Sequence, residues 1–463
     1  MLTDIVSDRR LPILIAIVIA LAVLTLLLPF AVHHASGLQG YEAEWTARAI
    51  LDGHGFSVRG NHRHLWYGLD ADKIYPTAWV DPVFTYTLAG AHWLFGRYAF
   101  PAIVGLNFLA LAAVMYMAYN LSARFGGPWA GVVAVVFIAL HVHFLRGYIG
   151  IDNAPLASFF LMLTVLVAVR YFEQPTAIRL VVMGVFTGAS LLACPAVQYL
   201  AYGIALAVFV HHLISRQVSL AIVRPIAMLA LAAVVLAPWA IRNYRTFGET
   251  VLVRNGAGQM AYVGTVAAAE TFMPGAAKSA LPAPWQSSGP REAITRMINK
   301  PYRMALNHYQ VDAWVATPPP NYEQMNEAQR DKLYFKRTKD FVREHPRAFI
   351  EMGLTKLQIF TLRYGKYGFG LVLLAIAGAV LTLRETRSWP LSLAAASYAA
   401  PFVLIVAYYE RYRLPIEPVL AVLSAVAVAF VVGFVREHYS RRARLSQSTA
   451  VKMGTKITAS NTL

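Results

Sequence analysis

Two carboxylates close to an apolar run are the residues of this sequence whose type and spacing best suit chemistry. Glu42 and Glu44 follow the first long apolar run, residues 11–32, on a helix-favouring stretch that Gly53 and Gly55 end. A carboxylate held near a membrane surface can act as a general base toward a hydroxyl group. Alternatively, both are solvated charges on an interfacial helix. The spacing alone leaves both interpretations open.

Four arginines beside apolar runs are candidates for binding a phosphate. Arg242 and Arg245 follow one apolar run, and Arg411 and Arg413 lie between two others. A guanidinium group binds phosphate through a rigid pair of hydrogen bonds. The alternative is contact with lipid headgroups, which is typical of basic residues that flank membrane spans.

Two further acidic residues and a group of histidines complete the polar candidates. Asp81 is another possible base, whereas Asp152 precedes an apolar run, where capping of a helix explains an acidic residue equally well. His62 and His64, with His54 nearby, form a pair in a loop separated by one residue, and we predict no metal site there.

Aromatic residues are concentrated around these polar positions. They could stack on a sugar, but an aromatic belt at the membrane interface explains them equally well. They are Trp45, Trp66, Tyr67, Trp79 and Trp93.

The elements that must position these residues are membrane spans. The composition is 57% hydrophobic and 14% charged, with a mean hydropathy of +0.49, outside the range of a soluble domain. The net charge of +17 therefore indicates anionic lipid rather than nucleic acid. Ten runs are long enough to span a bilayer. They are residues 11–32, 100–121, 128–145, 154–172, 178–193, 196–213, 221–241, 368–383, 390–409 and 414–434.

The short basic loops orient these spans. With the N-terminus inside, they all fall in the cytoplasm, as the positive-inside tendency requires. Residues 82–95 would invert this order if they formed a span, so we predict a helix at the interface. The basic residues concerned are Arg124, Arg170, Arg179, Arg216, Arg224, Arg384, Arg387, Arg441, Arg442 and Arg444.

This topology leaves two large segments outside, residues 33–99 and 242–367. The predicted fold is therefore an all-α polytopic membrane protein of about ten transmembrane helices with two large outer loops that contain interfacial helices. Residues 255–320 should be irregular, and 322–344 should form a polar helix that Pro346 ends. Cys194 excludes an intramolecular disulfide, because it is the single cysteine, and it lies in an apolar stretch.

Several segments resemble the GT-C superfamily of polyprenyl-phosphate-sugar-dependent glycosyltransferases, in its protein O-mannosyltransferase and lipid A aminoarabinose transferase branch. Their order and topological positions both agree with that branch. They are GYEAEWTARAILDGHGFS (40–57), PTAWVDPVFTYTLAGAHWLFG (76–96), APWAIRNYRTFGE (237–249), DFVREHPRAFIEMGLTKL (340–357) and ERYRLPIEPVL (410–420).

One departure from the family concerns the base. The family's first outer loop usually carries an Asp, often in an Asp-Glu pair, whereas this sequence has Gln39, Tyr41 and Glu42 nearby. The resemblance therefore implies Glu42 as the base, with Glu44 as the reserve. It also relates Asp152 to a second acidic position of the family.

The resemblance implies a membrane glycosyltransferase that moves a sugar from a polyprenyl-phosphate donor to a lipid, glycan or protein acceptor, with inversion and one carboxylate base. No cofactor is expected to be obligatory, and the need for a divalent metal is undetermined. We expect the inner membrane, both termini in the cytoplasm and a periplasmic active site. A polysaccharide polymerase or ligase and a lipid-linked sugar transporter or flippase remain alternatives.

The domain organisation follows from the same topology. Residues 1–367 would form the GT-C-like catalytic module, residues 368–435 the C-terminal transmembrane helices, and residues 436–463 a basic cytoplasmic tail.

Overall fold

The structure is a computed structural model of the 463-residue chain. It describes residues 10–35, 42–60, 72–262, 264–265, 321–362, 365–405 and 410–460.

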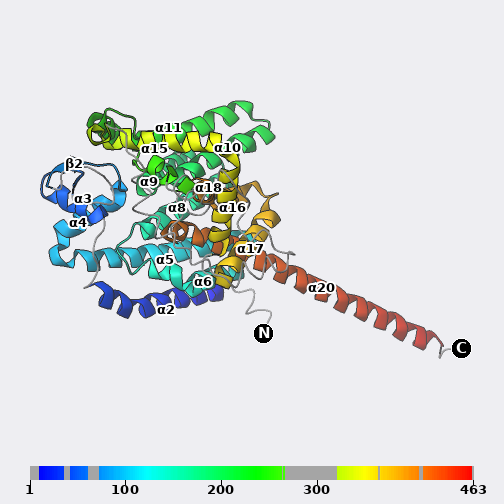
Figure 1. The fold of residues 1–463 in the computed structure, drawn as a ribbon. Helices are drawn as coiled ribbons and strands as arrows, with labels where there is room; N and C mark the ends of the chain where they lie inside the picture. The colour runs from blue at the N-terminus through cyan, green and yellow to red at the C-terminus, as the bar shows by residue number, and fades with distance from the viewer. Residues whose placement is uncertain are drawn as a thin grey trace.

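Long apolar helices form a bundle in which helices pack both on their neighbours in the sequence and on helices more distant in the chain (Figure 1). Thus α5 packs on α6, α8 on α9 and α17 on α20. The helices are α2 (Arg10–Ala35), α5 (Ala99–Gly126), α6 (Pro128–Leu140), α7 (Val142–Arg146), α8 (Ala154–Glu173), α9 (Ala177–Ala193), α10 (Val197–Ile214), α11 (Val218–Phe247), α17 (Gly365–Thr382), η7 (Thr386–Ser388), α18 (Trp389–Leu404), α19 (Glu410–Arg413), η8 (Leu414–Ile416) and α20 (Glu417–Ser460).

Eight of the ten predicted runs overlap a single one of these helices, whereas run 128–145 is divided between α6 and α7 and run 414–434 between η8 and α20. Within the described ranges, six helical segments are long and apolar enough to cross a membrane, while α6 and α9 are apolar but shorter. The number of ten spans therefore stays a prediction. The six segments are Arg10–Ala31, Pro82–Gly126, Ala154–Glu173, Val197–Ile214, Val218–Phe247 and Leu414–Ser440.

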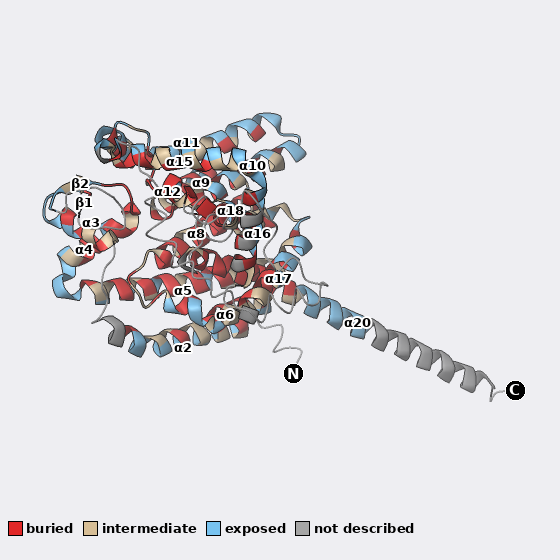
Figure 2. Ribbon diagram, in the orientation of Figure 1, coloured by how far each residue is buried: buried red, intermediate tan, exposed pale blue. Residues whose placement is uncertain are grey.

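The burial pattern is that of a protein whose outer surface faces lipid (Figure 2). On α2, Leu14, Leu21 and Leu26 are more than half exposed, whereas most of α8 is buried. Large apolar side chains along a whole helix would be a liability in water, but acyl chains cover them at no cost. The chain is therefore a multi-pass membrane protein.

Short elements gather at one end of this bundle, which we call the loop end (Figure 1). They come from both predicted outer loops. They are α3 (Glu42–Leu51), β1 (Ser57–Arg59), β2 (Ile74–Pro76), α4 (Pro82–Phe95), η1 (Gly96–Tyr98), α12 (Ala257–Tyr262), η6 (Tyr322–Gln324) and the start of α15 (Glu327–Glu344). The helix that follows, α16 (Pro346–Leu362), packs on α17 and α18 instead.

Helix α4 is separate from the span that follows it. Gly96, with φ +53°, and the turn η1 end α4 before α5 begins. At 1.5 Å per residue, its 14 residues reach only about 21 Å, less than the roughly 30 Å of a hydrocarbon core. This length agrees with the predicted interfacial helix, although its position in the bilayer stays a prediction.

Two strands correct the expectation of an all-α chain. β1 and β2 pair antiparallel, with Val58 opposite Tyr75. Strands of three residues carry too little alternation to stand out in a sequence. The ribbon fixes the path of the chain from α3 to α4.

The polar helix predicted for residues 322–344 is present as η6 followed by α15. Asn326 caps α15 in a capping box with Gln329, and the helix ends at Glu344. Pro346 then begins α16, because a proline fits the first turn of a helix but not its interior. Of the segment predicted to be irregular, residues 257–262 form α12, and most of the remainder lies outside the described residues.

Candidate active site at the loop end

Helix α3 separates the two predicted carboxylates. Residues two positions apart on a helix do not face each other. Glu44 is buried, forms an ion pair with Arg48 at 2.6 Å and lies 3.8 Å from Nε2 of His92 on α4. Glu42 is the first residue of α3 and is only partly buried. The two carboxylates therefore have different environments, and Glu44 is neutralised by a cation.

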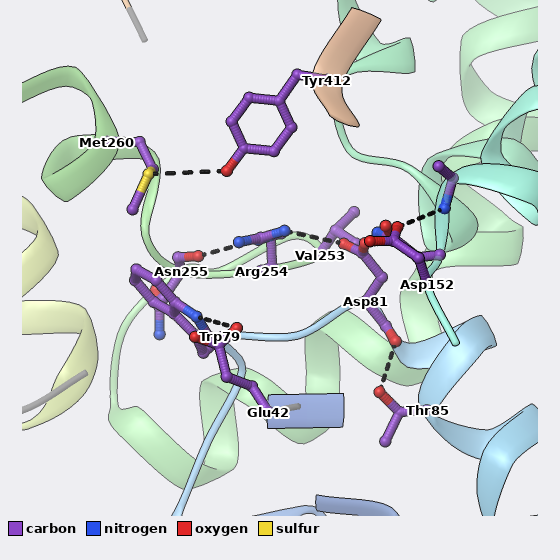
Figure 3. A network of polar contacts seen from close by, with 12 residues as sticks. Glu42, Trp79, Asp81, Thr85, Asp152, Val253, Arg254, Asn255, Met260 and Tyr412 are labelled. Carbon is purple, nitrogen blue, oxygen red and sulfur yellow. Dashed lines mark hydrogen bonds and ion pairs between the residues drawn. The ribbon is translucent and has the colours of Figure 1, made fainter. Parts of the chain in front are cut away.

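Trp79 connects Glu42 to the second outer loop. Its indole Nε1 donates to Oε2 of Glu42 at 3.3 Å, and the guanidinium carbon of Arg254 lies 5.6 Å from the centroid of the Trp79 ring (Figure 3). Gly256 packs against the same ring with φ +100°, where a Cβ atom would lie 2.5 Å from the indole. Trp79 thus holds a carboxylate at its edge and a cation over its ring.

Arg254 also pairs with Asp81. The distance between Nη1 of Arg254 and Oδ1 of Asp81 is 3.4 Å, and the Asp81 side chain is 3% exposed against 26% for Arg254. The side-chain amide of Asn153, at the start of α8, donates to the other Asp81 oxygen. Asp81 therefore joins both outer loops to the bundle, and its charge is compensated.

The end of α11 positions Arg254. The indole of Trp239 donates to the carbonyl of Val253 at 2.5 Å, and the side chain of Asn243 donates to the carbonyl of Val251 at 3.0 Å. These bonds satisfy buried backbone groups of an irregular segment. Arg254 directly follows this hydrogen-bonded backbone segment, which therefore positions its side chain.

Asp152 supports the start of α8. Its carboxylate accepts a hydrogen bond from the backbone N–H of Ala154 at 2.9 Å. The N-cap of α8 is Asn153, so Asp152 lies one residue before the capping position that the sequence offered as an alternative. The close-up draws Asp152 in the same polar network as Asp81 (Figure 3).

Two acidic residues of α15 accept hydrogen bonds from the backbone of the two outer loops. Glu327 accepts from the backbone N–H of Ala78 and from the side chain of Asn255, both at 3.0 Å, and Asn255 donates its own N–H to the carbonyl of Ala78 at 2.9 Å. Burial raises the pKa of Glu327 to about 7, although these bonds oppose the shift. Burial also raises the pKa of Asp331, which accepts from the N–H of Gln259.

Arg242, near the end of α11, connects the start of the second outer loop to the first outer loop. It donates to the carbonyls of Thr77 at 2.8 Å and Phe56 at 2.6 Å, and its guanidinium lies over the rings of Phe56 and Trp239. These contacts occupy much of its donor capacity within the protein. Arg245, one turn further along α11, is exposed.

The two C-terminal arginine candidates lie in α19, where the side chain of Arg411 is outside the described part of the chain. Arg413 is fully buried, forms an ion pair with Glu417 and donates to the carbonyls of Phe360 and Gly368. An arginine enclosed in this way is poorly placed to reach a ligand outside the bundle.

Glu417 also contacts a histidine. Nε2 of His141, at the break between α6 and α7, lies 3.2 Å from Oε2 of Glu417, and both side chains are almost completely buried. The sequence reasoning did not identify either residue, because their proximity joins segments far apart in the chain. Arg413, Glu417 and His141 form a polar cluster inside the bundle.

The remaining candidates bear less on the site. His62, His64, Trp66 and Tyr67 lie outside the described residues, and Trp93 is largely exposed. In the described ranges, no group of three or more His, Cys, Asp or Glu side chains is arranged to hold a metal ion. The need for a metal therefore stays untested.

Sequence reasoning missed the roles of Arg254 and Glu327. Arg254 lies in the irregular segment VLVRNGAG. Glu327 is the first residue of a helix whose sequence is typical of a polar surface helix. Neither pattern indicates that these residues meet the first outer loop. A usable signal was the capping box before Glu327, which fixes the start of α15.

Comparisons with known proteins add a structural likeness. No family model matches the sequence, and no curated protein matches it. The archaeal oligosaccharyltransferase AglB from Archaeoglobus fulgidus, solved with an inhibitory peptide and a dolichol-phosphate, has 14% identity and a TM-score of 0.47 over 87% of this chain. ArnT from Cupriavidus metallidurans, bound to undecaprenyl phosphate, has 15% identity and a TM-score of 0.32 over 91% of this chain.

The chain spans about half the length of AglB, 47%, and 77% of ArnT. At identities and TM-scores this low, the likeness does not by itself assign a function.

Proposed function

We propose that the protein is a membrane glycosyltransferase that moves a sugar from a polyprenyl-phosphate donor to an acceptor hydroxyl at the loop end. The observation that carries this proposal is the Glu42, Trp79 and Arg254 group, in which a carboxylate and a guanidinium flank one indole. The GT-C resemblance of the sequence supports it. The acceptor would be a lipid, a glycan or a protein.

The reaction needs one base. Glu42 would take the proton of the acceptor hydroxyl while that oxygen forms a bond to the anomeric carbon. The bond from this carbon to the phosphate oxygen breaks, and the lipid phosphate leaves as a stable anion. Because the leaving group needs no proton, a general acid is unnecessary, and a single displacement inverts the anomeric carbon. No obligatory cofactor is proposed.

The contacts of Glu42 suit this role better than those of Glu44. Among the described residues, Glu42 makes no ion pair, and the neutral indole N–H of Trp79 orients its carboxylate. Glu44 instead forms an ion pair with Arg48. Asp81 is likewise paired, with Arg254.

Arg254 is the cation that we place nearest the donor phosphate. It is partly exposed, adjoins Trp79, pairs with Asp81 and donates to the carbonyl of Asn255. Arg242 and Arg413 each donate to two carbonyl groups of the protein. A second cation would come from Arg245 or Arg411. These groups would stabilise the negative charge that grows on the phosphate as the glycosidic bond breaks.

The physics of the donor favours a site at the ends of apolar helices. Each buried methylene of a polyprenyl tail contributes about 0.8 kcal/mol to membrane affinity, so its phosphate and sugar remain at the bilayer surface. The loop end joins α3, α4 and α15 to the ends of α8 and α11. We propose that this end faces the periplasm from the inner membrane, with both termini in the cytoplasm.

The test combines lipid and glycan mass spectrometry with one variant. Cells that lack the protein should lose a sugar modification and accumulate the polyprenyl-phosphate sugar, and the parent protein should restore both. Glu42→Gln should restore neither, while it reaches the membrane in normal amounts. Full restoration by Glu42→Gln would exclude Glu42 as the base. An unchanged lipid and glycan profile in cells without the protein would contradict the proposed function itself.

A second candidate function is transport of a lipid-linked sugar, and the Arg413, Glu417 and His141 cluster favours it. Ionisable residues inside a bundle, beside breaks between helices, are typical of transporters. Transport would require movement of the labelled donor across a proteoliposome membrane without change to its glycosidic bond. If the protein is a transporter, the parent should move the labelled donor and Glu417→Gln should not. If it is a transferase without transport activity, the parent itself should move no donor.

A further inference from the structure

A basic groove lies at the end of the bundle opposite the loop end. It has a volume of about 500 Å³ and is lined by charged residues of three helices. They are Arg124 at the end of α5, Arg170 and Glu173 at the end of α8, and Arg179 at the start of α9.

The geometry of α8 separates this groove from the candidate active site. α8 begins beside Asn153, which contacts Asp81, and its 20 residues end at Glu173. At 1.5 Å per residue, this helix is about 30 Å long, close to the hydrocarbon thickness of a bilayer. The groove and the candidate active site are therefore at opposite surfaces of the membrane.

The charges in the groove are only partly compensated. Both carboxylate oxygens of Glu173 accept from Nη1 of Arg124 at 2.6 Å. Arg179 donates through one guanidinium nitrogen to the backbone carbonyl of Arg170 at 2.6 Å, which leaves its charge unpaired. Within the described part of the chain, the guanidinium of exposed Arg170 makes no hydrogen bond or ion pair. Three arginines and one glutamate leave an excess of two positive charges.

Apolar side chains adjoin these cations. Ile178 and Val182 of α9 line the groove, and Ile178 is 67% exposed. A water-soluble anion would gain nothing from this apolar wall. A phospholipid, in contrast, presents a phosphate at the height of the arginines and an acyl chain directly beside it.

We propose that this groove binds the headgroup of an anionic phospholipid, with Arg170 and Arg179 on its phosphate and one acyl chain along Ile178 and Val182. Arg124 and Glu173 fix the spacing between the ends of α5 and α8. The proposal is independent of the proposed function, because no residue of the groove belongs to the loop end.

The experiment uses the full-length protein in a mild detergent, with phosphatidylglycerol as the probe and native mass spectrometry as the readout. Phosphatidylcholine controls for the tail, because it has the same acyl chains and no net charge. Inorganic phosphate controls for a simple anion, because it has no tail. Bound phosphatidylglycerol should exceed bound phosphatidylcholine, and millimolar phosphate should not displace it.

Arg170→Gln and Arg179→Gln should each weaken phosphatidylglycerol binding about fivefold, the usual effect of one basic residue at an anionic membrane surface. Arg216→Gln is the matched control, because Arg216 is exposed in the turn from α10 to α11 at the same end of the bundle. It removes the same charge outside the groove and should change binding less than twofold.

Three results would overturn the proposal. Equal losses for Arg216→Gln and Arg170→Gln would indicate attraction by the net charge alone. Equal binding of the two lipids would exclude recognition of the anionic headgroup. Displacement by inorganic phosphate would identify a site for a free anion. Thermal unfolding in detergent without added lipid checks that each variant folds like the parent.

Discussion

The arginines at the two ends of the bundle differ in their hydrogen-bond and ion-pair partners. At the loop end, Arg242 donates to two carbonyls and Arg254 pairs with Asp81, so that cations bind segments distant in the sequence to one another. At the opposite end, the charges of Arg170 and Arg179 are left without a carboxylate of their own. The first arrangement fixes geometry, as catalysis requires. The second leaves charge to be neutralised from outside the protein.

The comparison makes Glu42 the decisive residue, because within the part of the chain that the structure describes it is a carboxylate without an ion pair, whereas Glu44 and Asp81 are paired. Glu42→Gln keeps the shape of the side chain and removes the base. We expect turnover to fall by about 10² to 10⁴, with little change in donor affinity. Single-turnover rates and donor binding, measured on the same preparation, check this expectation.

Glu44→Gln is the matched control on the same helix. It removes the partner of Arg48 and should leave turnover within about threefold of the parent, since it touches no group near Trp79. A large loss of turnover in Glu44→Gln together with a normal rate in Glu42→Gln would show that Glu44, and not Glu42, is the base. Normal rates for both would exclude this helix as the source of the base.

The next effect concerns Arg254. Arg254→Gln should weaken donor affinity and turnover together by about 10- to 100-fold, because a guanidinium on the phosphate acts on both the bound donor and the departing anion. Arg254→Lys should recover only part of this loss, because lysine lacks the planar pair of donors. Donor titration and single-turnover rates measure both quantities.

Arg245→Gln and Arg411→Lys test the other arginine candidates beside Arg254. If Arg254→Gln binds and transfers normally while Arg245→Gln does not, the phosphate site lies further along α11. A selective loss in Arg411→Lys would assign it to α19. Equal rescue of every position by lysine would indicate headgroup contact rather than donor binding.

A smaller effect is expected from the pH dependence of Glu327. Burial raises its folded-state pKa to about 7 from an ordinary 4.5. Its contribution to stability is therefore fully present below about pH 4.5 and is lost as the pH rises through about 7. Between pH 5.5 and 7.5 the loss should be about 2 kcal/mol, and Glu327→Gln should remove it.

Thermal unfolding of the parent and of Glu327→Gln at several pH values measures this difference, and all other titrating groups cancel in the comparison. Parallel curves for the two proteins would show that Glu327 stays ionised in the folded state. In that case its bonds to Ala78 and Asn255 outweigh the cost of burial.

The smallest effect is that of Asp152. Asp152→Asn keeps an oxygen for the N–H of Ala154 and should leave both stability and turnover near those of the parent. Asp152→Ala removes the acceptor and should lower the free energy of unfolding by about 1 kcal/mol. A tenfold loss of turnover in Asp152→Asn would instead show that the negative charge takes part in the reaction.

The helices could be predicted from the sequence, because the signal for each helix lies within its own segment of the chain. Hydropathy placed a helix at every predicted span, and Pro346 marked the end of α15. The helix over residues 82–95 was predicted with these bounds, and its place at the membrane interface stays a prediction. The β1–β2 ribbon was missed because SVR and IYP are too short to show a period of two.

The site was only partly accessible because its contacts join distant segments. Helical geometry alone could have placed Glu42 and Glu44 on different faces of α3. No local pattern indicates that Glu327 reaches Ala78 across 249 positions, or that Arg254 pairs with Asp81 across 173. The burial of Arg413 likewise depends on Glu417 and on the carbonyls of Phe360 and Gly368, which the folded bundle supplies.

The contact between Gly256 and the Trp79 ring limits how this protein can be recombined. A side chain at position 256 would collide with the indole, and its backbone conformation disfavours any residue other than glycine. A smaller residue at position 79 would relieve the collision but not the strained φ. A chimera that imports the second outer loop from another chain must therefore import the partner segment around position 79 with it, as one inherited unit.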